Sequence, residues 1–226
     1  MGKMGKFIVV DGLDGSGKNT QTELLAKELE NAGKKVISLS YPRYGTAGAK
    51  PVETYLSGGL GGKPEDTGAI PASVLFAVDR YLSYRTEWAE EYRKPETVIL
   101  ADRYTSANAV HQLSKLPKEE WDSFLSWLWD FEFRQMGIPV PDQVIFLDVP
   151  PEISLSLVEK RHRESGRTVD IHESDRNYMR RCYEAALYAS EKLGWMRISC
   201  APDGVMRGIG DLHREITDKL KKLNIL

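Results

Sequence analysis

The sequence has little cysteine and no long apolar run. Its two cysteines, Cys182 and Cys200, have a spacing that matches no metal-binding or redox motif. We therefore expect two reduced, partly buried thiols. The apolar run Phe7–Val10 is only long enough for a strand, and the N-terminal region has no apolar stretch typical of a signal peptide. These features predict a cytoplasmic protein with no membrane partner.

The chain also lacks an excess of charge of either sign. It has 31 lysines and arginines against 33 aspartates and glutamates, for a formal net charge of -2. A general nucleic-acid binder is usually basic, so we expect no nucleic-acid partner. A local group of arginines could still bind a phosphate. The charge balance therefore excludes a general nucleic-acid binder but not a phosphate-binding site.

Short apolar runs alternate along the chain with longer amphipathic stretches. Runs of this length, rich in β-branched residues, are typical of strands buried on both faces. The predicted strands are Phe7–Val10, Val36–Leu39, Val98–Leu100, Val144–Leu147 and Met196–Ser199. The predicted helices are Lys18–Asn31, Pro71–Arg93, Lys118–Met136, Pro151–Glu164, Ser174–Lys192 and Val205–Leu223. This alternation predicts an α/β fold, a five-stranded parallel sheet with helices on both faces.

The length of 226 residues suits a single domain over residues 1–226. Two irregular stretches interrupt the pattern. Residues 44–69 are rich in glycine and proline, with a possible short helix near residues 52–56, and residues 164–173 are polar and charged. Long polar segments within a compact domain are often functional loops. We expect the second to form a small lid over about residues 161–174.

The strongest functional motif follows the first predicted strand and opens the first predicted helix. It fits the phosphate-binding pattern G-x-x-x-x-G-K-[ST] in the required strand-to-helix context. Glycines let backbone N–H groups surround a phosphate, and the helix N-terminus adds a positive partial charge. The expected nucleotide-binding residues are Gly12, Asp14, Gly15, Ser16, Gly17, Lys18, Asn19 and Thr20.

One position departs from this pattern. Asn19 stands where a serine or threonine usually ligates magnesium, and its carbonyl oxygen is a plausible but not equivalent ligand. Thr20 is adjacent but faces about a third of a turn away on the helix. We expect Mg²⁺ as the cofactor, with Asn19 and Asp102 as candidate ligands, either directly or through water.

A second motif, Asp102-Arg103-Tyr104, lies at the end of the third predicted strand. Ligands of parallel α/β sheets gather at the carboxyl ends of the strands. Asp102 could there orient magnesium-bound water, and Arg103 could clamp phosphate oxygens. The alternative for such a pair is a simple surface ion pair.

Taken in order, GLDGSGKNTQ, YPR, LFAVDR and DRY resemble the thymidylate kinases, from Phe7 to about Gly194. The resemblance implies a P-loop kinase fold, ATP as the phosphoryl donor, and thymidine monophosphate as the acceptor in dTTP synthesis. It also implies a homodimer, for which the aromatic helix containing Trp121 and Phe131 would be a candidate face, and core packing is the alternative for this surface.

The resemblance also implies roles for single residues. Arg43 and Arg103 would bind the acceptor phosphate, and Phe76 would stack on the base. Arg80 would bond the base edge, and Tyr104 would crowd the sugar. Phe76 and Arg80 are four residues apart and share one helix face, which suits stacking combined with a donor. Core packing is the alternative for Phe76.

Further acceptor-side candidates follow the DRY motif. Gln112 lies where the family often has a glutamine, and His111 replaces its preceding aromatic residue. The family's common serine is replaced by Ala107, with Ser106 one residue earlier. We expect His111 and Gln112 to line the acceptor site, with His111 as a polar wall residue and not as a catalytic base.

The lid is expected to carry a catalytic arginine. Gly15 follows Asp14, so the phosphate loop has no arginine of its own, and the sequence resembles the lid-arginine class of the family. Arg167, in the middle of the loop, is the first candidate and Arg163 the second, while Arg161 lies just before them. Such a charge would stabilise the transferring phosphoryl group. The alternative is a solvated basic patch at a helix end.

Three other interpretations remain compatible with the motifs. One is a kinase for another nucleotide or for a deoxynucleoside, for which Asp14 could supply a base. Another is a P-loop nucleotide switch that controls a partner protein. The third is a degenerate family member in which Asn19 has lost magnesium binding and catalysis.

Overall fold

The structure, a computed structural model, describes residues 4–165 and 176–225. Its five strands form one parallel sheet in the order β2-β3-β1-β4-β5. Their bounds are β1 Lys6–Gly12, β2 Lys35–Ser40, β3 Thr97–Asp102, β4 Gln143–Asp148 and β5 Met196–Ser199. All five predicted strands and the predicted α/β class are therefore confirmed.

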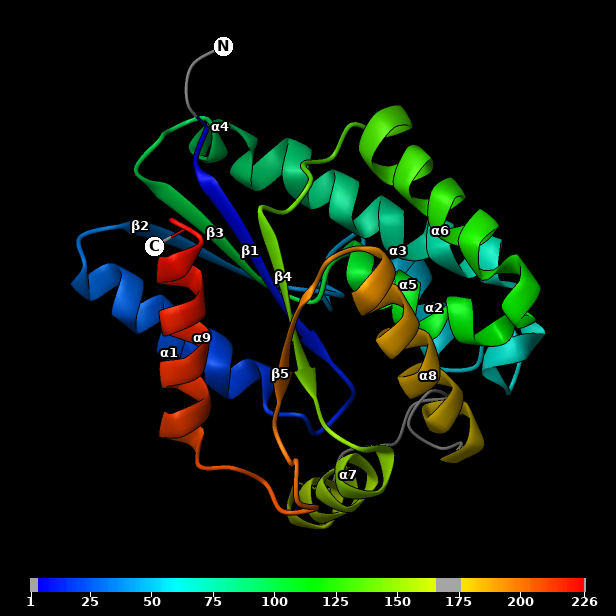
Figure 1. Ribbon diagram of the computed structural model, residues 1–226. Coiled ribbons are helices and arrows are strands. Elements are labelled where there is room, and N and C mark those ends of the chain that lie inside the picture. Colours follow the sequence, from blue (N-terminus) through cyan, green and yellow to red (C-terminus); the bar gives the residue numbers. More distant parts are fainter. Residues whose placement is uncertain (1–3, 166–175, 226) are drawn as a thin grey trace.

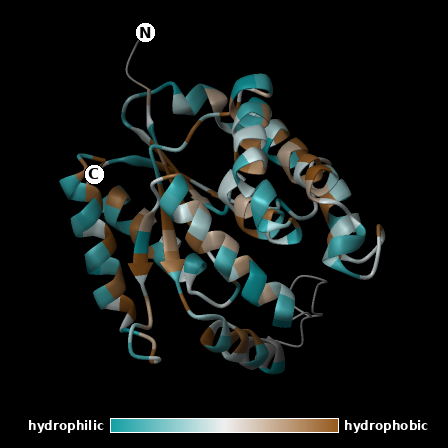
Figure 2. Ribbon diagram, turned by 45° about the vertical axis from the view of Figure 1, so that its right-hand side comes forward, coloured by the Kyte–Doolittle hydropathy of each residue, from teal (hydrophilic) through white to brown (hydrophobic). Residues whose placement is uncertain are grey.

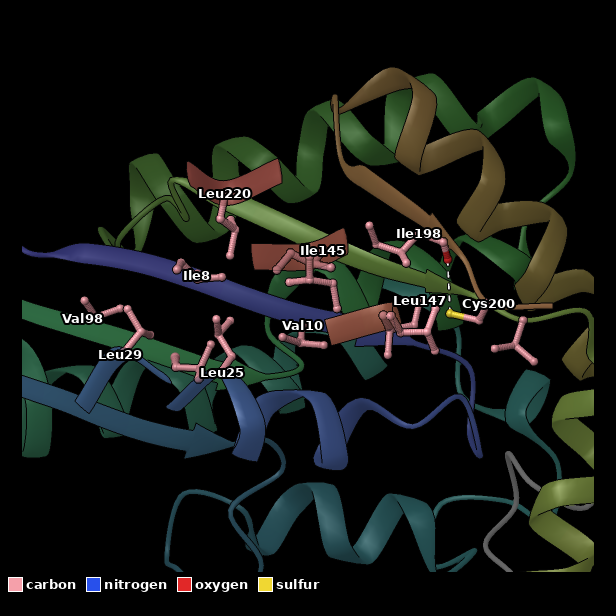
Figure 3. Close-up of a cluster of buried hydrophobic side chains, with 14 residues drawn as sticks. Ile8, Val10, Leu25, Leu29, Val98, Ile145, Leu147, Ile198, Cys200 and Leu220 are labelled. Atoms are coloured by element: carbon pink, nitrogen blue, oxygen red, sulfur yellow. Dashed lines mark hydrogen bonds between the residues drawn. The ribbon is translucent and has the colours of Figure 1, made fainter. Parts of the chain in front are cut away.

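Helices α1 and α9 cover one face of the sheet (Figure 1). α1 spans Lys18–Asn31, as predicted, and α9 spans Ile209–Lys222. Figure 3 shows Leu25 and Leu29 of α1 and Leu220 of α9 packed on strand side chains such as Ile8 and Ile145. Hydropathy follows the same division, with apolar strands at the centre and polar helix surfaces outside (Figure 2).

The remaining helices cover the opposite face of the sheet or lie beyond the ends of its strands. They are α2 Lys50–Leu56, α3 Ala69–Ser83, α4 Ala89–Tyr92, α5 Thr105–His111, α6 Trp121–Trp129, α7 Pro151–Ser165 and α8 Arg176–Lys192. Phe7 of β1 packs there against Trp88 and Tyr104, with ring centroids 5.3 and 4.8 Å apart. α7 lies beyond the carboxyl ends of the strands (Figure 1). In the described ranges, no helix has both the length and the apolar character that a membrane span requires.

Two helix predictions need correction, and one helix was missed. The predicted helix Pro71–Arg93 is divided by a π-helical turn, Tyr84–Trp88, between α3 and α4. The predicted helix Lys118–Met136 begins with a 3-10 turn and ends in a π-helical turn, Asp130–Gln135. α5 was not predicted, because its polar residues Thr105, Ser106 and Asn108 give no amphipathic pattern.

The prediction of strands buried on both faces holds for β1, β3 and β4. It is wrong for β2 and β5, which are the edge strands and have exposed positions. Both cysteines are buried and unbridged, as predicted. The aromatic helix surface is mostly core, since Trp121, Phe124 and Leu128 are buried, although Trp129 is 48% exposed.

Candidate active site

The loop between β1 and α1 has the geometry of a phosphate-binding loop. A Cβ on Gly12 would lie 2.9 Å from the carbonyl oxygen of Leu147 on β4, so only glycine fits there. Gly17 caps α1 with φ 89°, in the left-handed region that favours glycine. Asp14 and Gly15 are half-buried, Ser16 is buried, and Asn19 and Thr20 are exposed on the first turn of α1.

Lys18 folds back over this loop. Its Nζ donates hydrogen bonds to the carbonyl oxygens of Gly12 and Leu13, at 2.9 and 2.8 Å. Nζ also lies 3.9 Å from Asp14 Oδ1. Burial, together with the positive charge of Arg103, lowers the pKa of Lys18, while Asp14 and Asp102 oppose this change. The ammonium is thus fixed at the mouth of the loop, where an outer phosphate would need it.

Arg103 joins the DRY motif to the phosphate loop. Its Nη2 lies 2.5 Å from Asp14 Oδ1, and its Nη1 lies 3.1 Å from Nε2 of His111. The backbone of Arg103 has φ 68°, and its N–H donates to the carbonyl of Val10 at 3.0 Å. A left-handed conformation is unusual for an arginine, and such residues are concentrated at functional sites.

Asp11 is a member of this site that the sequence patterns did not single out. It lies one residue before the end of β1, is 1% exposed, and accepts a hydrogen bond from Ser106 Oγ at 2.5 Å. Its other oxygen accepts from the N–H of Gly12 at 2.8 Å and lies 3.8 Å from Arg103 Nη1. Its place directly before the glycine-rich loop was the available clue, because polar residues at strand ends gather at such sites.

The oxygen atoms present at the site are suited to a hard cation. Asp102 is partly exposed, and its Oδ1 is buried without a hydrogen-bond partner in the described part of the chain. Burial raises the pKa of Asp102, and the nearby Lys18 and Arg103 oppose this rise. Asn19 donates from Nδ2 to Glu23 Oε1 at 2.8 Å, which restricts the orientation of its amide. Within residues 4–165 and 176–225, no cluster of three or more His, Cys, Asp or Glu residues is arranged to hold a metal alone.

The loop after β2 carries Arg43 next to the DRY motif. The N–H of Tyr41 donates to the carbonyl of Asp102 at 3.1 Å, which joins this loop to the end of β3. The N–H of Arg43 donates to Asp79 Oδ2 at 2.9 Å. Nη2 of Arg43 lies 2.5 Å from Glu87, whereas its buried Nη1 has no hydrogen-bond partner among the described residues. Burial raises the pKa of Asp79, while its hydrogen bond from Arg43 opposes the rise.

Phe76 lies on the partly exposed face of α3, as its predicted stacking role requires. Tyr55 of α2 packs edge-on against it, with ring centroids 6.0 Å apart. Lys115 donates to Tyr55 Oη at 2.9 Å and to the carbonyl of Thr67 at 3.0 Å. These contacts anchor α2 and the segment after it beside Phe76.

Three residues expected to contact the substrate are buried instead. Arg80 is 1% exposed and forms a two-point ion pair with Glu132, at 2.7 and 2.6 Å. Tyr104 is completely buried among core aromatic rings, which contradicts a direct contact with the sugar. Gln112 is also completely buried. Sequence reasoning missed Glu132, because it lies 52 residues from Arg80 in a helix that was predicted to be regular.

His111 is also buried, and it lies behind Arg103. It ends α5, is 5% exposed, and contacts Arg103 from α5. The predicted lid is largely outside the described residues, and this includes Arg167. Arg161 and Arg163 fall near the end of α7, and the Arg163 side chain is exposed. α7 approaches the phosphate loop through Ser154, whose Oγ donates to the carbonyl of Asp14.

This arrangement combines the phosphate loop after β1 with Arg103, which follows β3, and Arg43, which follows β2. Fold and site together define a P-loop kinase, a phosphotransferase that acts on a small phosphorylated acceptor. The family model for thymidylate kinase matches residues 10–203. The chain belongs to the thymidylate kinase family and is a nucleoside monophosphate kinase.

Individual relatives agree with this assignment. The chain is 30% identical over 191 residues to the thymidylate kinase of Mycobacterium tuberculosis (strain H37Rv), covering 84% of this chain and 87% of that one. It is 27% identical to the enzyme of Schizosaccharomyces pombe, covering 98% and 94%. The solved structure of thymidylate kinase from Candida albicans matches with a TM-score of 0.70 at 17% identity, over 98% of this chain and 93% of that one, which supports the fold.

Proposed function

We propose that this protein transfers the γ-phosphoryl group of ATP to thymidine monophosphate and so forms thymidine diphosphate, a step in dTTP synthesis. The observation that carries the proposal is the contact of Arg103 with Asp14, at 2.5 Å. This contact brings Arg103, the arginine proposed to bind the acceptor, directly against the loop that would hold the phosphates of the donor. Two phosphorylated substrates would therefore meet at this point.

The donor would bind along the loop from Gly12 to Thr20. Backbone N–H groups and the N-terminus of α1 would hold its phosphates, and Lys18 would contact the outer phosphates as a point charge. Nζ of Lys18 would exchange its present bonds to two carbonyl oxygens for bonds to phosphate. A buried hydroxyl, Ser16 Oγ, has no hydrogen-bond partner within the described ranges and would be available to the ligand.

The acceptor would bind beside the phosphate loop, on the side of the molecule that carries Arg43, Arg103 and Phe76. Arg43 and Arg103 would hold its phosphate, and Phe76 would stack on the base. The buried Nη1 of Arg43 supports this role, because such a group is costly to leave unpaired. Asp79 and the ion pair between Arg80 and Glu132 would hold these elements in place without touching the substrate.

The reaction needs no general base. The second pKa of a phosphate monoester is near ~6, so the acceptor is already mostly a dianion at neutral pH. Magnesium, when bound, supplies charge neutralisation between the two substrates, and we propose Asp102, through water, and Asn19 as its protein contacts. The chain's own residues would position the substrates in line and neutralise charge.

A lid over about residues 161–174 would supply a further positive charge, from Arg167 or Arg163. Closing such a lid would exclude water and suppress hydrolysis of ATP. Because the phosphate loop has no arginine, this charge would have to come from outside the loop.

The decisive experiment measures ADP release with ATP and a panel of acceptors. The panel holds the monophosphates of thymidine, deoxyuridine, uridine and other deoxynucleosides, unphosphorylated thymidine, and a blank. We expect the highest kcat/KM with thymidine monophosphate. Preference for thymidine over its monophosphate would instead support a deoxynucleoside kinase, and equal ATP turnover in the blank would support a nucleotide switch. Discrimination against deoxyuridine monophosphate rests on one methyl group, worth only ~1–3 kcal/mol.

We also propose that the protein is a cytoplasmic homodimer. The exposed Trp129 of α6, which packs on Phe133 at 4.6 Å, supports an interface on this side of the molecule. Sedimentation equilibrium of the purified protein tests the dimer directly.

A further inference from the structure

His111 lies at the centre of a buried polar cluster behind Arg103. The cluster is built from α5, the 3-10 turn Leu113–Lys115 and α8. The imidazole contacts Arg103 Nη1 at 3.1 Å through Nε2 and Cys182 Sγ at 3.6 Å through Nδ1. The backbone carbonyl of His111 accepts hydrogen bonds from Tyr178 Oη at 2.8 Å and Ser114 Oγ at 2.9 Å. His111 is therefore held from several sides.

The hydrogen bonds of this cluster fit a single arrangement of protons. A guanidinium can only donate, so Nε2 of His111 must be the acceptor toward Arg103. The proton of a neutral imidazole then sits on Nδ1 and points to the sulfur of Cys182. The thiol of Cys182 in turn donates to Ser114 Oγ at 3.4 Å, and this hydroxyl donates to the His111 carbonyl. Each group thus has a consistent donor or acceptor role.

We propose that His111 is a positioning residue for Arg103, whose guanidinium it holds toward the acceptor phosphate by accepting a hydrogen bond at Nε2. Asp14 fixes Nη2 on the other side, so the plane of the guanidinium is set by two different elements. This inference rests on the proposed function, because it assumes that Arg103 binds the acceptor.

The surroundings of His111 keep its Nε2 unprotonated and thus able to accept a hydrogen bond. Burial and the positive charge of Arg103 lower the pKa of His111 to about 3; Lys18 and Lys115 add to the decrease and Asp14 opposes it. Burial raises the pKa of Cys182 to about 12 and that of Tyr178 well above its ordinary value, so both remain protonated donors. The arrangement of protons is then constant over the working pH range of a cytoplasmic enzyme.

Four variants test the role of His111: His111→Phe, His111→Gln, Arg103→Ala and the double variant His111→Phe/Arg103→Ala. His111→Phe removes a hydrogen bond to a charged group. We therefore expect it to raise the KM for thymidine monophosphate about tenfold and to leave the KM for ATP unchanged. His111→Gln should restore most of the loss, because its amide oxygen can accept in place of Nε2. His213→Gln, on α9 and distant from the cleft, is the control and should match the wild type.

The double variant separates positioning from general structural damage. If His111 acts through Arg103, the double variant should be no worse than Arg103→Ala alone. Fully additive losses, or an equal rise in the KM for ATP, would overturn the proposal. Wild-type activity of Arg103→Ala would overturn both the role of Arg103 in the proposed function and the role of His111, whereas a defect in Arg103→Ala that His111→Phe does not share would overturn only the role of His111.

A second measurement needs no variant. Long-range ¹H–¹⁵N NMR of the labelled wild-type protein should show His111 protonated on Nδ1, with Nε2 unprotonated and unchanged from pH 8 to pH 5. Protonation on Nε2 would overturn the proposal even if His111→Phe failed to fold.

Discussion

Arg80 and Glu132 form a two-point ion pair that is completely buried between α3 and the π-helical turn after α6. Nε and Nη2 of Arg80 lie 2.7 and 2.6 Å from the two carboxylate oxygens. Thr105 Oγ1 and Asn108 Nδ2 donate to the same carboxylate, at 2.8 and 3.1 Å. The pair thus joins the helix that carries Phe76 to the helix that carries His111.

Removing the carboxylate of this pair should strongly destabilise the fold. Glu132→Ala leaves a buried guanidinium unpaired, and we expect the free energy of unfolding to fall by roughly 3–5 kcal/mol. Urea denaturation followed by circular dichroism measures this change. The matched control is Glu184→Ala, which breaks an exposed ion pair with Lys118 and should cost only about 0–1 kcal/mol. Similar losses in the two variants would contradict a structural role for the buried pair.

The two cations that would neutralise the phosphates should be essential for turnover. Lys18→Ala and Arg103→Ala should each reduce kcat by about 10²–10³ or more, because each removes a positioned charge. Initial rates at saturating substrates measure the effect, and circular dichroism checks the fold. Lys34→Ala, at an exposed position after α1, is the control. Rates close to the wild type in either active-site variant would refute the assignment.

Glu87 is expected to weaken acceptor binding by competing for Arg43. The carboxylate lies 2.5 Å from Nη2 and is partly exposed. Glu87→Gln should therefore lower the KM for thymidine monophosphate modestly, by up to about fivefold, the range of an exposed ion pair. Arg43→Ala should raise the same KM. Glu90→Gln removes one exposed charge from the following turn and controls for long-range electrostatics; an unchanged or higher KM in Glu87→Gln alone would contradict the competition.

The free energy of unfolding should change with pH in the alkaline range, because Lys115 titrates there. Burial lowers the pKa of Lys115 to about 8, whereas in the unfolded chain it is about 10.4. Between these values the unfolded chain binds more protons, so the free energy of unfolding should rise with pH, by about 2 kcal/mol over the window. Below pH 8 both states are protonated and the slope disappears.

Urea denaturation at pH 7.5 to 10 compares the wild type with Lys115→Met. The unfolding free energy of the wild type should rise with pH relative to that of Lys115→Met. Lys63→Met is the control for loss of an exposed lysine. A difference that is constant with pH would show that Lys115 has an ordinary pKa.

The features that could be predicted from the sequence are those carried by neighbouring residues. The glycines of the phosphate loop, Lys18 and the adjacent strand and helix lie within one short segment, so the motif determines the local geometry. Five apolar runs determined the strands, and the parallel arrangement followed from their alternation with helices. Phe76 is only partly exposed on α3 and also packs against Tyr55, so its stacking role stays a prediction.

The remaining features depend on partners distant in the sequence. Arg80 looks like a base-reading residue until Glu132 is known to face it, and Tyr104 looks accessible until Phe7 and Tyr41 are packed around it. The π-helical turns after Ser83 and Trp129 also leave no pattern in local hydropathy. Sequence patterns identify residue types near a site, but burial decides which of them reach its surface.

The order of the strands sets the spacing between the phosphate loop, Arg103 and Arg43. β1, which leads into the phosphate loop, pairs directly with β3, which leads into Arg103, and β3 pairs with β2, which leads to Arg43. The distance between the phosphate loop and the two arginines is thus determined by ladders of backbone hydrogen bonds, about the stiffest part of any fold.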